Sequence, residues 1–532
     1  MKKYLVALLL SASISFCYAQ EALQKVKINL FDGGQNSYDL SDVLNANQGE
    51  SLKNVVLSKK GVLSKRGGQS IFGLDNGNSA FDGAEIFKQS ATNIWAIAAS
   101  GTSVIRTDVS SPLSWTVINP SNPITAGKAV EFIQANNTFF IFNGFDNTCW
   151  YDGTTFLQST VYPTSPPTIS CGAWLANYLF GSGNPTYPDY VYFSNNLSPT
   201  VFSASDLFRV NTGDGQKVVW LEPFKLTELI IYKENSIFNL DISGATPLTD
   251  WTLQPVSTRI GCVAPRSVVN VGNDQVFLSS DPIAVRSLVR TSYDKLTLEK
   301  LSGPIQDIFD DTGDNPINRN AIKKACATLY DDKYILAIPA GSSTVNNYVC
   351  VLDFVTKSWY IITGWYPADW ITYQNNLYYV DAKDGRIVEC FTGTVGDLAT
   401  GPTTSSAASV AISYEYISKN INFDNSENYK SLDSIEVEFG TTGDYDGDVY
   451  INIDDGGFQY IGSVNLSGDV VTLPVTLPFT LFGEGRARKT FQLTEYGQFR
   501  NLKVKVVQDG LSESCKLYSA TVFASVEPWR RE

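Results

Sequence analysis

The feature that most constrains the fold is a pair of short apolar runs that recurs seven times along the chain. Each first run follows a polar turn with Asn or Asp, and a second run follows about ten residues later. The first runs begin at Ile94, Phe139, Tyr178, Leu229, Val276, Tyr334 and Leu377, and the second runs begin at Val104, Cys149, Tyr190, Ile237, Val285, Tyr348 and Arg386. Each pair predicts a β-hairpin, because short runs rich in Val, Ile, Tyr and Phe between turn residues are typical of strands.

The spacing of the repeat indicates a β-propeller. Successive first runs begin 39 to 58 residues apart, which is near the size of a four-stranded propeller blade. One blade cannot bury both of its faces, whereas blades stacked around an axis bury them against each other and leave few free edges. The irregular spacing leaves six and seven blades open as alternatives. A β-solenoid is the structural competitor, but its repeats are shorter.

The predicted fold class is therefore all-β, a six- or seven-bladed β-propeller followed by a C-terminal β-sandwich. We expect a signal-like peptide at 1–19, an N-terminal arm at 20–75, the propeller at 76–397, a small polar linker at 398–409 and the sandwich at 410–532. Six or seven strands over about 120 residues fit a sandwich. The runs beyond the linker begin at Ile412, Ser434, Asp448, Val470, Leu502 and Lys516. One short helix is expected near residues 40–53.

The first residues have the composition of a secretory signal. Lys2 and Lys3 precede a short apolar stretch at 5–16, and Ala19 ends a small-x-small cleavage site before Gln20. The stretch is too short for a good membrane span, and no later segment qualifies as one. This start leaves a periplasmic or secreted location open.

The residue types present exclude several kinds of chemistry. The chain has no histidine, which removes the commonest general base, the Ser–His and Cys–His pairs and the commonest zinc ligand. Its eight cysteines have no C-x-x-C spacing and lie mostly in apolar runs, so we expect small buried hydrophobic residues. No G-x-S-x-G elbow and no Asp-box of propeller sialidases is present. We therefore expect no enzyme, no catalytic, cofactor-binding or metal-binding residues and no cofactor; a cluster of carboxylates and Arg at the propeller axis would favour a secreted glycan-active enzyme instead.

An acidic cluster near the C-terminus is the main candidate for ion binding. It consists of Asp444, Asp446, Asp448, Asp454 and Asp455. Asp-rich turns can hold Ca²⁺, which takes several oxygen ligands, but the spacing is not that of an EF-hand. Hairpin turn residues are the alternative interpretation. A second acidic group, at Asp310, Asp311 and Asp314, is a weaker candidate.

Other polar motifs are expected to be structural. Residues 233–236 (KENS) between two apolar runs predict a tight hairpin turn. Gly33-Gly34 and Gly67-Gly68 are expected to be turns with positive φ, because no strand–Gly–helix context for a phosphate loop surrounds them. Residues 529–531 (WRR) are expected to be a frayed end.

The formal net charge of −14 argues against coating of nucleic acid, because binding to the DNA backbone needs excess Lys and Arg. An acidic wall can still guide DNA without holding it.

Several short stretches, in a fixed order, carry a resemblance to a known family. They lie at 31–36 (FDGGQN), 53–56 (KNVV), 61–63 (GVL), 65–68 (KRGG), 180–185 (FGSGNP), 190–194 (YVYFS), 220–224 (WLEPF), 231–237 (IYKENSI), 260–269 (IGCVAPRSVV), 271–274 (VGND) and 277–279 (FLS). Through their order and spacing, about residues 27–392 resemble the tail-hub proteins of short-tailed bacteriophages. These proteins, often called packaged-DNA stabilisation proteins, are related in architecture to propeller-based tail nozzles.

The resemblance implies a structural protein of the virion tail. Such a protomer assembles as a homo-oligomer, often a six-fold ring, below the portal and adaptor, where it lines the DNA exit channel and retains the packaged genome. The implied partners are the portal, the adaptor and other tail proteins, with DNA passing through without sequence-specific contacts, and no catalytic residue carries over. Family members normally assemble in the cytoplasm, so the signal-like start departs from the pattern. An exported bacterial β-propeller that binds carbohydrate or protein at the cell envelope is the alternative.

Overall fold

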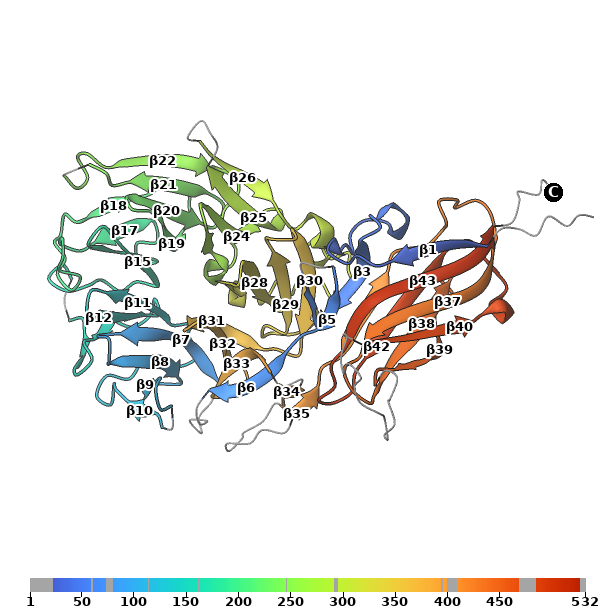
Figure 1. The fold of residues 1–532 in the computed structure, drawn as a ribbon. Coiled ribbons are helices and arrows are strands. Elements are labelled where there is room, and N and C mark those ends of the chain that lie inside the picture. The colour runs from blue at the N-terminus through green and yellow to red at the C-terminus, as the bar shows by residue number, and fades with distance from the viewer. Residues whose placement is uncertain are drawn as a thin grey trace, which may run out of the picture.

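A computed structural model describes residues 23–58, 61–72, 80–112, 114–160, 162–244, 246–290, 295–393, 396–399, 409–467 and 485–526. Within these ranges the chain is all-β, and its helical elements are short 3-10 turns: η1 (Ser41–Val43), η2 (Pro265–Ser267), η3 (Gly303–Ile308), η4 (Ile322–Lys324) and η5 (Thr494–Tyr496). A ring of sheets lies beside an elongated body of C-terminal strands (Figure 1). No helix in these ranges is long and apolar enough to span a membrane.

The ring is a β-propeller, as the repeat predicted, and six of its units are separate four-stranded antiparallel sheets. These are β7 (Phe81–Lys88), β8 (Ile94–Ser100), β9 (Ser103–Asp108) and β10 (Thr116–Val117); β11 (Glu131–Ala135), β12 (Thr138–Phe142), β13 (Cys149–Tyr151) and β14 (Phe156–Gln158); β15 (Cys171–Leu175), β16 (Tyr178–Ser182), β17 (Tyr190–Phe193) and β18 (Leu207–Arg209); β19 (Val218–Lys225), β20 (Glu228–Lys233), β21 (Ile237–Asp241) and β22 (Thr252–Ser257); β23 (Val269–Val271), β24 (Asp274–Ser280), β25 (Ile283–Arg290) and β26 (Leu296–Lys300); and β31 (Pro367–Tyr373), β32 (Asn376–Asp381), β33 (Ile387–Thr392) and β6 (Gly68–Phe72).

Four further strands lie between the last two of these sheets in the chain. They are β27 (Cys326–Tyr330), β28 (Lys333–Ile338), β29 (Tyr348–Asp353) and β30 (Ser358–Thr363), and they belong to a ten-stranded sheet that continues into the C-terminal body. The sequence left six and seven blades open. In the structure, six blades form separate sheets.

The predicted hairpins are confirmed, and β8 shows why their runs are apolar throughout. Ile97 and Ala99 pack in one cluster with the following blade, β11–β14. Ala96 and Ala98 pack in another cluster, with residues of β31, β32 and β33. Because both faces of the strand are buried between neighbouring blades, every position in the run is apolar instead of every second one.

The N-terminal segment closes the propeller. β6 pairs with β33 as the outer strand of the last blade, with Phe72 opposite Ile387 and Gly68 opposite Thr392. The propeller is thus closed by a strand from the segment 20–75, which was expected to be a separate arm.

The C-terminal body consists of two sheets that share one hydrophobic cluster. One sheet contains β4 (Val55–Leu57), β5 (Leu63–Lys65), β43 (Lys516–Val526), β37 (Lys430–Gly440), β40 (Arg486–Gln492), β1 (Gln24–Ile28) and β41 (Gln498–Phe499); the other continues from β30 through β3 (Gln48–Lys53), β36 (Tyr414–Ser418), β42 (Leu502–Gln508), β38 (Asp446–Ile453) and β39 (Phe458–Asn465), with β2 (Gly34–Gln35) beside β3. Val437 and Val522 of the first sheet pack with Val449 and Val504 of the second.

β3 joins the propeller to this body. Its Lys53 pairs in parallel with Ile361 of β30 and antiparallel with Glu415 of β36. The helix expected near residues 40–53 is wrong beyond the one turn of η1, because pairing on both sides of β3 outweighs local helix propensity. Where a linker was expected, β34 (Gly396–Leu398) pairs with β35 (Ser409–Ala411). Residues 400–408, the signal-like residues 1–19, the run at Val470 and the tail at 529–531 lie outside the described residues.

Candidate functional site

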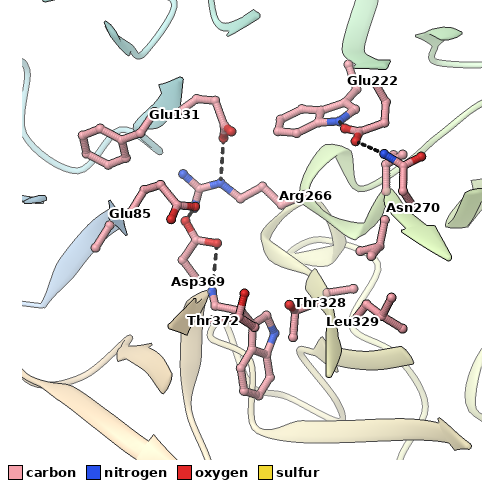
Figure 2. A pocket seen from close by; sticks show the side chains of 16 residues that line it. Glu85, Glu131, Glu222, Arg266, Asn270, Thr328, Leu329, Asp369 and Thr372 are labelled. Atoms are coloured by element: carbon pink, nitrogen blue, oxygen red, sulfur yellow. Dashed lines mark hydrogen bonds and ion pairs between the residues drawn. The ribbon is translucent and has the colours of Figure 1, made fainter. Parts of the chain in front are cut away.

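The candidate site is a cavity of about 380 Å³ between the inner strands of the propeller (Figure 2). Residues of β7, β11, β19, β23, β27 and β31 line it, together with η2. Its volume falls in the range of about 300–1,000 Å³ that is typical of ligand pockets. Segments far apart in the sequence therefore meet at this one place.

Arg266 enters the cavity from η2. Pro265 occupies the first position of this turn, where its missing N–H costs nothing. The Ser267 hydroxyl donates to the carbonyl of Ala264 at 2.6 Å, and the Tyr334 hydroxyl donates to the carbonyl of Ser267 at 2.7 Å. These bonds fix the turn and thereby the direction of the Arg266 side chain.

The guanidinium of Arg266 binds mainly to backbone carbonyls. Its Nη2 donates to the carbonyls of Val130 at 2.5 Å and Asp82 at 3.3 Å, and its Nη1 lies 3.5 Å from the carbonyl of Ala368. A Cβ on Gly83 would lie 2.4 Å from the Val130 oxygen and 3.1 Å from Nη2. Gly83 is therefore required for this close approach, which ties the first, second and last sheets of the ring together.

Three carboxylates surround the same guanidinium. Arg266 Nε lies 3.6 Å from Glu131 Oε2, and Nη1 lies 3.8 Å from Asp369 Oδ2; Glu85 points toward the same group in Figure 2. Both measured distances exceed the range of a good hydrogen bond. Arg266 is thus close enough to attract these carboxylates without hydrogen-bonding to them.

A fourth carboxylate, Glu222, lies on the other side of the cavity (Figure 2). It accepts hydrogen bonds from Trp220 Nε1 at 3.0 Å and from Asn270 Nδ2 at 2.7 Å. These neutral donors orient the carboxylate without cancelling its charge.

Burial changes the acidity of all four groups. It raises the pKa of Glu85 to about 7, of Glu131 to about 8 and of Glu222 to about 7, and it also raises the pKa of Asp369. Repulsion from neighbouring carboxylates adds to the effect at Glu85 and Glu131, while Arg266 opposes it at Glu131 and Asp369. Near neutral pH the site therefore holds both protonated and ionised carboxyls, a combination that occurs at functional sites.

Sequence reasoning missed these residues, although a usable signal was present. Glu85, Glu131, Glu222 and Asp369 each lie seven to nine residues before the first apolar run of their unit. That offset places all four on the innermost strand of a blade. Inner strands converge on one axis, so a carboxylate repeated at this offset predicts an acidic axial cavity.

The acidic cluster near the C-terminus is only partly brought together. Asp444, Asp446 and Asp448 line a second cavity of about 420 Å³ with Asp509 and Glu513. Among the residues that the structure describes, no group of three or more His, Cys, Asp or Glu is placed to hold a metal ion.

The two remaining members of that cluster, Asp454 and Asp455, lie in the turn after β38 with φ of 46° and 58°. They are turn residues, the alternative interpretation of the motif. Asp311 of the weaker acidic group pairs with Arg319 at 2.8 Å on the surface.

The glycine pairs behave differently from each other. In the first pair, Gly34 has a φ of 67°, as expected for a turn, whereas Gly33 is not in the positive-φ region. Gly67 and Gly68 are not in the positive-φ region, and this expectation is wrong. A Cβ on Gly68 would lie 2.1 Å from the carbonyl of Gly396. Glycine is therefore required at position 68 because the backbone of β34 approaches it closely, and not because of a turn.

The expectations for the 233–236 turn and for the described cysteines hold. Residues 233–236 connect β20 to β21, and Lys233 is buried against Asp214 at 2.7 Å. The seven described cysteines are all buried and none forms a disulfide: Cys149, Cys171, Cys262, Cys326, Cys350, Cys390 and Cys515. They pack as small hydrophobic residues.

Comparisons with known proteins give no family for this chain. No protein-family model matches it, and no curated protein matches it either. Among solved structures, it is similar to the computationally designed Ika8 protein, with a TM-score of 0.38 and 12% identity over 61% of this chain and 100% of that one. It is also similar to BBS1N in complex with ARL6DN, with a TM-score of 0.40 and 9% identity over 62% of this chain and 98% of that one.

Proposed function

We propose that this protein is a structural component of a bacteriophage tail, a hub or nozzle protein that assembles below the portal and adaptor, lines the DNA exit channel and retains packaged DNA. The observation that carries the proposal is the ordered resemblance over about residues 27–392. The positions of the resembling stretches support a role based on shape, as two arginines within them illustrate.

Arg66, in the stretch 65–68, fixes the segment that closes the propeller. Its Nη1 donates to Asp397 Oδ1 at 2.8 Å, its Nη2 also binds Asp397, and its Nε donates to Asn54 at 2.9 Å. The guanidinium lies 4.7 Å from the ring centre of Trp365. Every part of this side chain holds other parts of the protein in place.

Arg266, in the stretch 260–269, serves the same purpose at the axis through its bonds to backbone carbonyls. Both arginines therefore contribute to a rigid wall. The sheet that runs from β27 through β3 to β39 makes that wall continuous with the C-terminal body, whose two sheets we interpret as a β-sandwich.

A DNA channel built from this protein lies between copies and not through one propeller. Arg266 enters the axial cavity and bonds to the carbonyls of Val130 and Asp82 in neighbouring blades, so the axis is occupied by protein and leaves no room for a duplex whose major groove alone is about 12 Å wide. The proposal therefore includes a closed homo-oligomeric ring, six-fold in the family that the chain resembles. The net charge of −14 suits a channel wall that repels DNA and lets it slide.

Electron microscopy of the purified full chain, alone and with the portal and adaptor of its source, tests the ring. The proposal predicts closed rings whose central opening lies between protomers. Monomers alone under both conditions would contradict it.

A second candidate function is favoured by the axial cavity itself. Carboxylates and an arginine at the axis are the feature that would favour a secreted glycan-active enzyme, one that binds and processes a carbohydrate. A glycan array with the full chain and its Glu131→Gln variant tests this candidate. Binding or cleavage that depends on Glu131 would support it, and a blank array would leave the tail protein as the sole proposal.

A further inference from the structure

Lys65 provides a buried amine between the two C-terminal sheets. It is the last residue of β5, in the first of these sheets, and is only 7% exposed. Its Nζ donates to Gln508 Oε1 at 2.5 Å and to the carbonyl of Gly510 at 3.2 Å. Among the residues that the structure describes, it forms no ion pair with a carboxylate. A lysine is rarely buried to this extent unless it is paired, so its position needs another explanation.

The surroundings of Lys65 favour the neutral, nucleophilic form of its amine. Burial is the main cause that lowers its pKa to about 8, and Arg66 adds to the shift, while Glu513 and Asp509 oppose it. A desolvated lysine with a lowered pKa is a typical activated nucleophile. Near pH 8 about half of the Lys65 side chains are therefore neutral and able to attack a carbonyl carbon.

The side-chain amide of Gln508 is the electrophile within reach of this amine. Gln508 is the last residue of β42, in the other sheet, and is 2% exposed. Because a C=O bond is about 1.23 Å long, the amide carbon lies no further than about 3.7 Å from Lys65 Nζ. Reacting atoms in a near-attack position are about 3–3.5 Å apart. The hydrogen bond thus holds the amine beside the carbon that it can attack.

Glu513, in the turn after β42, contacts the other end of the same amide. Its Oε2 accepts a hydrogen bond from Gln508 Nε2. A carboxyl group in this position can pass a proton to the amide nitrogen, which allows that nitrogen to leave as ammonia. Gln508 and Glu513 also line the second cavity, of about 420 Å³. Ammonia released at this point therefore has a space through which it can depart.

We propose that Lys65 and Gln508 form an intramolecular isopeptide bond, with Glu513 as the proton-transfer group. Lys65 Nζ bonds to the amide carbon of Gln508, and the bond from that carbon to Nε2 breaks. One proton moves from Nζ through Glu513 to Nε2, which leaves as ammonia. An amine and a primary amide thus become a secondary amide and ammonia, and no other reactant is needed. The reaction occurs once per chain and does not depend on the tail role.

The bond ties the N-terminal segment to the C-terminal strands. The two residues that it joins are 443 positions apart in the chain. It links β5 to β42 and so connects the two sheets of the C-terminal body covalently. Only two residues, Arg66 and Gly67, separate β5 from β6, the strand that closes the propeller. The same link therefore also anchors the closing strand.

Tandem mass spectrometry of the full chain, purified, denatured and digested with trypsin, tests the proposal. We expect peptide 61–66, uncut after the modified Lys65, to be joined to peptide 506–516 with the loss of one ammonia. The linked pair should be absent from Lys65→Arg, because the guanidinium stays protonated and does not attack the amide. Lys516→Arg, at an exposed position on β43, is the matched control and should retain the linked pair.

Glu513→Gln tests the proton transfer, because its amide can still accept the hydrogen bond from Gln508 but cannot carry a proton. Positioned proton transfer contributes about 10²–10⁴-fold to a rate, so the linked fraction in freshly purified protein should fall at least tenfold. If this variant fails to fold by circular dichroism, Glu513→Ala replaces it, and the same tenfold fall is required. Unlinked peptides alone in the wild type, or an unchanged linked fraction in the folded variant, would overturn the proposal.

Discussion

Two arginines of the propeller, Arg66 and Arg266, illustrate opposite uses of the same side chain. Arg66 is fully buried and meets one carboxylate, that of Asp397, in a two-bonded pair with further bonds to Asn54 and the carbonyl of Thr363. Arg266 meets several carboxylates but gives its short bonds to backbone carbonyls. In the first arrangement the Asp397 carboxylate neutralises the charge of Arg66, so the pair serves a structural purpose alone. The second leaves Glu131 and Asp369 with only long contacts to the guanidinium, at 3.6 and 3.8 Å.

The largest effect should come from breaking the Arg66 pair. Arg66→Met leaves the Asp397 carboxylate buried, at 6% exposure, without its partner. Losing one member of a buried pair costs about 3–5 kcal/mol. Urea unfolding monitored by circular dichroism should show this loss. A loss below about 1 kcal/mol would mean that the pair does not hold the closing segment.

Gly83→Ala should have the next largest effect. The new Cβ meets the Val130 oxygen at 2.4 Å and displaces the backbone against which Arg266 is bound. Such overpacking costs about 1–3 kcal/mol. Gly303→Ala is the matched control, because nothing lies within 4 Å of its Cβ and its φ is not positive. Equal thermal unfolding of the two variants would contradict the tight axial contact.

Arg266→Met should cost less than Arg66→Met, because the axial carboxyls can take up protons when the cation is removed. We expect a loss of about 1–3 kcal/mol. The loss should be greater at pH 8.5 than at pH 6, because the carboxyls must ionise at the higher pH. Urea midpoints at the two pH values measure this difference. A loss independent of pH would show that Arg266 does not act on the carboxyls.

The smallest expected effect on stability comes from the pH dependence of the axial carboxyls. The folded pKa of Glu131, about 8, lies above its ordinary value, so the folded state binds more protons than the unfolded state between these values. Stability from this group is therefore present at low pH and is lost as the pH rises toward 8.

Glu131→Gln removes that dependence. The wild type should lose more stability than the variant between pH 6 and pH 8.5, by a few degrees in melting temperature at most. The difference between the two proteins is the relevant quantity, because Lys65, whose pKa burial lowers to about 8 in the unlinked chain, has the opposite pH dependence. A zero difference would place Glu131 in an ordinary solvated environment.

The sequence alone predicted the propeller well, because its signal is local. Runs such as 139–142 are apolar at every position, since both faces are buried between blades, and hairpins need only neighbouring residues. It failed where distant segments meet. Nothing near Gly68 or Gln48 indicates that β6 pairs with β33 or that β3 joins β30 to β36.

The axial site was missed for a related reason. Glu85, Glu131, Glu222 and Asp369 are separated by more than forty residues each, and carboxylates are common throughout the chain. Only their shared offset from the hairpin runs distinguishes them, and that offset acquires meaning once the runs are placed on blades around an axis. The turn expectation for Gly68 failed because its constraint comes from Gly396, far along the chain.

The most direct test of the tail role is mass spectrometry of gradient-purified particles from the source culture, with peptides allowed to begin at any residue. The account predicts this chain at several copies per particle, in a fixed ratio to the portal and adaptor across the gradient. Its presence only in the periplasm, medium or envelope fraction, with none in the particles, would contradict the tail role and favour an exported binding propeller.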